Sequence, residues 1–149
     1  MPPAAAPAPS NPPQQAREVC TQAAIAWLSP DTRTDSDPSA ARLRAAERWG
    51  TPALQATTAS APPARPTSEW REWNAHHARI SAHAVPYIGD APPPADHGRH
   101  YAAVQIARTA IGTGGWQQQL PEVTAYCTTS TEHGSVLVDQ LQITQAGQP

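Results

Sequence analysis

The chain has 149 residues, a net charge of −2 and five tryptophans but no phenylalanine. Its length is that of a single domain, and a nearly neutral composition without a basic stripe argues against a nucleic-acid-binding protein. No stretch approaches the ~20 apolar residues that span a bilayer, and the N-terminus lacks the charged and apolar regions of a signal peptide.

The first fourteen residues, MPPAAAPAPSNPPQ, are rich in proline and alanine. This composition predicts a semi-rigid extended linker rather than folded structure. Two interpretations stay open: a linker that carries a folded head away from a membrane anchor, or a disordered tail. We therefore expect residues 1–14 to be disordered, residues 15–145 to form one α+β domain, and residues 146–149 to be a tail.

Apolar residues at three- and four-residue spacing predict a first helix over residues 15–29. They are Val19, Cys20, Ala23, Ala24, Trp27 and Leu28. The Asp37-Pro38 pair combines an N-cap with a proline at the first helical position, and so predicts a second helix. Gly50 is expected to end that helix in the left-handed conformation.

The pair Thr51-Pro52 repeats the signal of a cap followed by proline, and predicts a short third helix that ends near Thr58. A proline-containing loop is expected to follow. Residues 69–75 are either a helical turn or the entry to a sheet.

Alternation of apolar and polar residues predicts four strands, over residues 77–88, 100–111, 122–131 and 135–144. Pro86 confines the first strand to an edge or a bulge. No crossover helices separate the strands, so the sheet is expected to be an antiparallel meander. Helices followed by a bent antiparallel sheet are typical of a cone-shaped α+β roll, here with three helices packed on a four-stranded sheet.

Large apolar side chains are scarce, so the tryptophans have to supply much of the buried area. We interpret Trp70, Trp73 and Trp116 first as core residues and second as an interface patch. A further alternative is that they stack on a sugar or an aromatic ligand.

Cys20 falls in the first predicted helix and Cys127 in the third predicted strand. A bond between them would close a long loop, worth ~4–5 kcal/mol on the chain-entropy model, and would suit a protein outside the cytoplasm. The alternative is two buried free thiols that act as small apolar side chains.

Several segments resemble those of a known fold in their order along the chain and in their residue patterns. These segments are Ala24–Leu28, Arg42–Arg44, Thr51–Leu54, Tyr101–Arg108, Gly114–Trp116 and Val136–Leu141. Together they resemble the nuclear transport factor 2-like fold. More closely, they are similar to the extracytoplasmic heads of conjugative type IV secretion proteins of Gram-positive bacteria, the TcpC and TraM class, which are relatives of the VirB inner-membrane assembly factor. The aromatic residue that usually follows the last hairpin turn in that family is missing here, where the turn reads Gly134-Ser135-Val136.

The resemblance implies a scaffold head that assembles with copies of itself or with secretion-channel subunits. It implies no cofactor, no catalysis and no nucleic-acid partner, and an extracytoplasmic location at the cell membrane through an anchor outside residues 1–149. A soluble cytoplasmic location is the alternative. All ten basic residues are arginine, which fits a GC-rich, actinobacterial genome.

The same fold class hosts isomerases and dehydratases that bury a pair of polar residues inside the cone. A general base there has to reach the substrate proton. The best candidates are His83 on the first strand and Asp139 on the last, with Tyr126 on the strand before it. Because fold alone does not grant function, we treat an enzyme or ligand-binding protein of this kind as the alternative function.

Two further patterns are weak. The histidines at 76, 77, 83, 97 and 100 lack the tight spacing of zinc ligands and are expected to be solvated. The glycine-rich segment 112–115 precedes no helix with Lys-Ser or Lys-Thr, so it is a turn and no phosphate-binding loop.

Overall fold

The computed structural model describes residues 11–62, 65 and 67–145. Its helices are α1 (Pro12–Trp27), α2 (Ser39–Trp49), α3 (Pro52–Ser60) and α4 (Ser68–Ala75), and its strands are β1 (Arg79–Val85), β2 (Arg99–Ile111), β3 (Gln117–Gln119), β4 (Val123–Glu132) and β5 (Ser135–Gln145). The strand order is β1-β2-β4-β5, with β3 paired to β2, and every pairing is antiparallel. The predicted α+β class and antiparallel sheet are confirmed.

Helix α1 begins at Pro12, three residues before the predicted start. Asn11 is the N-cap, because its side chain accepts a hydrogen bond from the backbone N–H of Gln14 at 2.9 Å. The two prolines that follow fit the first helical turn, where no backbone donor is needed. Residues 12–14 are therefore helix and no linker. The rest of the expected linker, residues 1–10, and the expected tail, residues 146–149, lie outside the described residues.

The corner between α2 and α3 corrects a second prediction. Gly50 is extended, with φ −98° and ψ 155°, so the expected left-handed stop is wrong. Glycine is required there by space, since a Cβ would lie 2.6 Å from the carbonyl oxygen of Ala46. Thr51 caps α3 as predicted, accepting a hydrogen bond from the backbone N–H of Leu54 at 3.2 Å.

The described residues hold one helix and one strand more than the three helices and four strands predicted. Residues 68–75 form a full helix, α4, because Thr67 caps it by accepting from the backbone N–H of Trp70. Strand β3 escaped prediction because Gln117–Gln119 shows no alternation of apolar and polar residues. Strand β1 is shorter than predicted: the left-handed backbone of His77, with φ 51°, precedes it, and Pro86 follows it.

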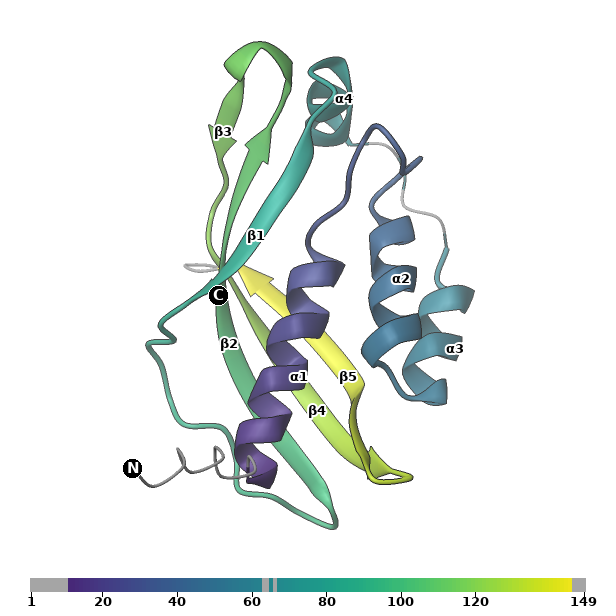
Figure 1. Ribbon diagram of the computed structural model, residues 1–149, viewed down its shortest axis with the longest axis vertical. Coiled ribbons are helices and arrows are strands. Elements are labelled where there is room, and N and C mark those ends of the chain that lie inside the picture. The colour runs from purple at the N-terminus through teal and green to yellow at the C-terminus, as the bar shows by residue number, and fades with distance from the viewer. Residues whose placement is uncertain (1–10, 63–64, 66, 146–149) are drawn as a thin grey trace, which may run out of the picture.

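Three helices cover one face of the sheet, which we call the inner face. Figure 1 shows α1 lying across this face, with α2 and α3 beside it and α4 near the far end of β1. The main core joins α1 to β2, β4 and β5 and includes Ala24, Val104, Ile106 and Val138. A smaller core at the far end holds Trp70, Trp73, Ile80 and Leu120. The inner face is thus occupied by helix side chains.

Cys20 of α1 and Cys127 of β4 are joined by a disulfide bond, with Cα atoms 5.8 Å apart and 107 positions between them in sequence. Both residues are buried in the main core, at 0% and 3% exposure. The bond fastens the first helix to the centre of the sheet.

Candidate functional site

The face of the sheet turned away from the helices, which we call the outer face, has an unusual composition. Because side chains alternate along a strand, it is formed by the residues between those of the core. At the centre of the face these are Ser81, His83, Val85, Tyr101, Ala103, Gln105, Ala107, Thr109, Thr124, Tyr126, Thr128, Gln140, Gln142 and Thr144. This central set contains no Asp, Glu, Arg or Lys, whereas Arg79, Arg99 and Glu132 lie on the same face at the ends of their strands.

The strand register places the larger outer-face side chains next to one another. Tyr126 on β4 lies opposite Ala103 on β2 and Gln142 on β5. One pair further along, Thr128 lies between Tyr101 and Gln140. Directly opposite residues of an antiparallel pair have Cβ atoms about 5 Å apart, so these side chains form one continuous patch.

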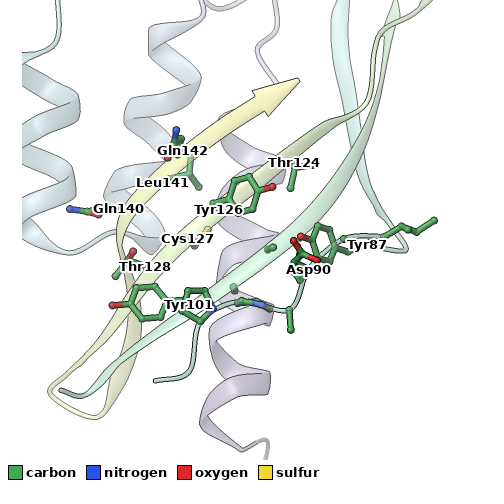
Figure 2. A pocket seen from close by; sticks show the side chains of 17 residues that line it. Tyr87, Asp90, Tyr101, Thr124, Tyr126, Cys127, Thr128, Gln140, Leu141 and Gln142 are labelled. Carbon is green, nitrogen blue, oxygen red and sulfur yellow. Dashed lines mark hydrogen bonds between the residues drawn. The ribbon is translucent and has the colours of Figure 1, made fainter. Parts of the chain in front are cut away.

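The loop between β1 and β2 adds a wall to this patch. Tyr87 in the loop donates a hydrogen bond from its hydroxyl to the carbonyl oxygen of Asp90 at 3.0 Å. Its ring lies against Gly89, where a Cβ would be 2.5 Å from the hydroxyl oxygen. Ile88, next to it, is 90% exposed. The loop and the strands enclose a groove of about 730 Å³, which Figure 2 shows and which we call the outer groove.

All three tyrosines of the chain, Tyr87, Tyr101 and Tyr126, line the outer groove. Burial raises the pKa of Tyr87 above its ordinary value, and the hydroxyl of Tyr126 and the carboxylate of Asp90 raise it further. The three tyrosines present hydroxyls and aromatic rings to whatever enters the groove.

The structure does not bring the predicted catalytic candidates together. His83 is exposed on β1, at one edge of the sheet, and Asp139 lies on β5, at the other edge. Two strands lie between them, and the register also places His83 opposite Ala107 of β2 whereas Asp139 lies level with His100 and Tyr101, several residues further along. The carboxylate of Asp139 accepts a hydrogen bond from the hydroxyl of Thr51. Tyr126 lies on the outer face, away from both.

The tryptophans singled out from the sequence lie mostly in the smaller core. Trp70 and Trp73 are 6% and 5% exposed and meet edge to face, with ring centroids 6.1 Å apart. The indole nitrogen of Trp73 donates to Gln118 Oε1 at 3.1 Å. Trp116 is half-buried and stacks on His76 at 4.1 Å between ring centroids. This placement leaves Trp70 and Trp73 little surface to offer a partner.

No group of three His, Cys, Asp or Glu side chains within the described ranges is arranged to hold a metal ion. His97 pairs with Asp96 in the exposed loop, and His76 is engaged by Trp116. None of the helices in the described part of the chain has the length and apolar character of a membrane-spanning helix.

Sequence reasoning missed the outer groove as a site. A signal was present, because Tyr101, Thr124, Tyr126, Gln140 and Gln142 occupy alternating positions in which no charge occurs. The third tyrosine, Tyr87, lies in a loop whose path no pattern in the sequence predicts. Only the folded structure shows that it closes the groove.

No family model matches the chain, and no curated protein does either. Solved structures do match. An IcmL-like type IV secretion system protein from Legionella pneumophila is similar with a TM-score of 0.61 and 14% identity, over 91% of this chain and 94% of that chain. The VirB8 protein from Agrobacterium tumefaciens is similar with a TM-score of 0.57 and 13% identity, over 94% of this chain and 97% of that chain. The chain therefore has the α+β fold of these two proteins over nearly its whole length.

Proposed function

We propose that this chain is a non-enzymatic interaction domain of a type IV secretion system, and that it contacts a partner protein through the outer groove. The observation that carries the proposal is the tyrosine-lined centre of the outer face, where the strand residues carry no charge, on a fold shared with an IcmL-like type IV secretion system protein. The finer assignment, to a conjugative channel of a GC-rich Gram-positive bacterium, rests on the resemblance to the TcpC and TraM class.

The composition of the outer face supports protein binding. The centres of protein interfaces are depleted in charged residues and enriched in tyrosine, because burying a neutral amide or hydroxyl costs far less than burying an ion. Tyr126 is 43% exposed and Ile88 is 90% exposed, so both have surface left to bury. These two side chains are the candidate anchors of the interface.

The inner face supports a scaffold over an enzyme. Helix α1 and the main core fill much of the interior of the roll, where a cavity of about 390 Å³ remains between Trp27, Arg108 and Ile143. The disulfide bond further fastens α1 in that place. A small isomerase, a dehydratase or a ligand-binding protein using the interior thus remains the weaker alternative.

The disulfide bond also bears on location. Such bonds form and persist in oxidising compartments and are rare in the cytosol, so Cys20–Cys127 supports an extracytoplasmic domain.

Site-specific photo-crosslinking in the native host tests this function. A photoreactive residue at position 126 is expected to crosslink to secretion-channel subunits. A matched position on the helix side, the exposed Glu47 of α2, serves as control and is expected to give no such product. The proposal fails if position 126 captures no secretion component, or if both positions capture the same proteins.

A further inference from the structure

Part of β2 has a neighbouring strand on one side only. Strand β1 pairs with β2 from Gln105 to Ile111, whereas β2 begins at Arg99. On its other side β2 pairs with β4 from Arg99 to Ile106. Arg99 itself bridges to Asp96, so residues 100–104 form an open edge among the described strands. Alternate peptide groups along such an edge point their N–H and C=O groups away from the sheet.

The chain itself ends β1 before it can cover this edge. Pro86 follows the last β1 residue, Val85, and has no N–H to donate to a strand ladder. The connection between β1 and β2 then runs away from the sheet, as Figure 1 shows. It returns through a tight turn in which Asp96 and Arg99 exchange backbone hydrogen bonds of 3.0 and 2.9 Å. Within the described chain, no backbone hydrogen bond links loop residues 86–95 to residues 100–104.

Space lies beside this edge on both faces of the sheet. The outer groove borders Tyr101, Ala102 and Ala103 on one face. A second groove of about 640 Å³, which we call the inner groove, borders the same three residues on the other face, between Arg17 of α1 and the loop prolines. An extended strand needs this arrangement, because its side chains alternate between the two faces.

We propose that an extended segment of a partner polypeptide adds to the sheet along residues 100–104 of β2, with alternate side chains in the outer and inner grooves. This inference rests on the proposed function and names the form in which the partner binds. The open edge is about 17 Å long at the usual rise of a strand. Main-chain hydrogen bonds supply affinity, and the grooves supply specificity.

The walls of the grooves indicate which segment fits. The three tyrosines of the outer groove favour uncharged apolar or aromatic side chains. Arg17, exposed at the inner groove, favours an acidic side chain. The loop and α1 flank the edge on both sides, so a single extended segment enters more readily than the sheet edge of a second folded copy.

The edges at β5 and β1 are partly obstructed. On β5, the register shifts opposite Thr128 and Thr129, and Gly50 bridges to Val138. At the start of β1, the N–H of Ile80 already donates to the carbonyl oxygen of Pro30 at 2.9 Å. Bulges and covering segments of this kind blunt an edge against strand addition.

The experiment uses the full chain and a phage-displayed library of random peptides as the probe. Selected peptides are then resynthesised with a single backbone N-methyl group at each position in turn. Strand addition predicts that methylation weakens binding by about tenfold or more at every second position and little at those between, because alternate amides face β2. Amide hydrogen exchange of the edge-facing amides within residues 100–104 is expected to slow in the complex. Methylation effects without this alternation, protection elsewhere, or a library that yields no binder each overturn the inference.

Two matched variants locate the site. Ala103 and Ala107 are both outer-face residues of β2 and both 8% exposed, but Ala107 lies where β1 already pairs. Ala103→Trp is expected to weaken peptide binding by about tenfold or more, and Ala107→Trp to leave it within about twofold. If Ala103→Trp does not fold, the methylation pattern on the unaltered chain decides. Peptides that bind without the alternating pattern contradict strand addition but do not affect the crosslinking result at position 126. Failure of this inference can therefore be distinguished from failure of the proposed function.

Discussion

The hydroxyl of Thr51 donates a hydrogen bond to Asp139 Oδ1 at 2.9 Å, linking residues that are 88 positions apart in sequence. The same hydroxyl oxygen accepts from the backbone N–H of Leu54 at the start of α3. The register shift between Thr128 and Thr129 leaves Asp139 without a residue opposite it on β4. The irregularity of β5 thus lets the carboxylate support the helix cap.

Thr51→Ala is expected to lower the free energy of unfolding by about 1–2 kcal/mol, because α3 loses its N-cap and Asp139 loses its donor. Thr51→Ser keeps the hydroxyl and is expected to lose much less. Urea unfolding of the two variants beside the unaltered protein measures the difference. Equal losses in both variants would show that the methyl group, and not the hydroxyl, matters at this position.

Loss of the Cys20–Cys127 bond is expected to cost ~4–5 kcal/mol, since the loop between the two cysteines is long and the unfolded chain gains its entropy back. Cys20→Ser with Cys127→Ser, and the unaltered protein with reductant, should show the same loss in thermal melting. Thiol titration in denaturant without reductant should find no reactive thiol. Two reactive thiols there would contradict the bond.

The Asp35 carboxylate is expected to make the free energy of unfolding depend on pH in the acid range. This carboxylate is 3% exposed and receives two hydrogen bonds from Arg44, of 2.6 and 2.9 Å, which hold its pKa below the ordinary value despite the opposing effect of burial. Because the pKa of Asp35 is lower in the folded protein than in the unfolded chain, the unfolded chain binds more protons at pH values between these two pKa values. The stabilisation is therefore complete above the ordinary pKa and is lost as the pH falls through the lowered one.

Arg44→Met should remove about 1–2 kcal/mol at neutral pH, a figure reduced because the guanidinium is 54% exposed. The loss should shrink toward acid pH, where Asp35 is protonated in both proteins. Urea unfolding across the acid range measures it. A loss that does not change with pH would mean that the guanidinium acts through packing and not through its charge.

Tyr126→Ala is expected to reduce capture of the partner by about tenfold or more while leaving thermal stability nearly unchanged, because the side chain is 43% exposed and lies outside both cores. Glu47→Ala on α2 is the control for an exposed residue away from the groove. Affinity purification and melting curves provide the two measurements. Undiminished capture by Tyr126→Ala would remove the groove from the interface.

Local patterns predicted most of the elements. The Thr51-Pro52 cap, the spacing of Cys20, Ala23 and Ala24, and the alternation along β2 and β4 are signals that need no distant partner. Errors arose where a distant contact decided the outcome. Gly50 is extended where it bridges to Val138 of β5 and the N–H of Thr51 donates to the carbonyl oxygen of Val138, and Gln117–Gln119 becomes a strand only because β2 lies beside it.

The sequence by itself determined the order of helices and strands and the uncharged alternation at the centre of the outer face, because both depend on neighbouring residues and on the period of each element. Tertiary structure alone decided that Tyr87 closes a groove over Tyr101 and Tyr126, and that residues 100–104 keep an open edge between two grooves. These features depend on the path of the loop after Pro86 and on where α1 packs. Both are set by contacts between residues far apart in the chain.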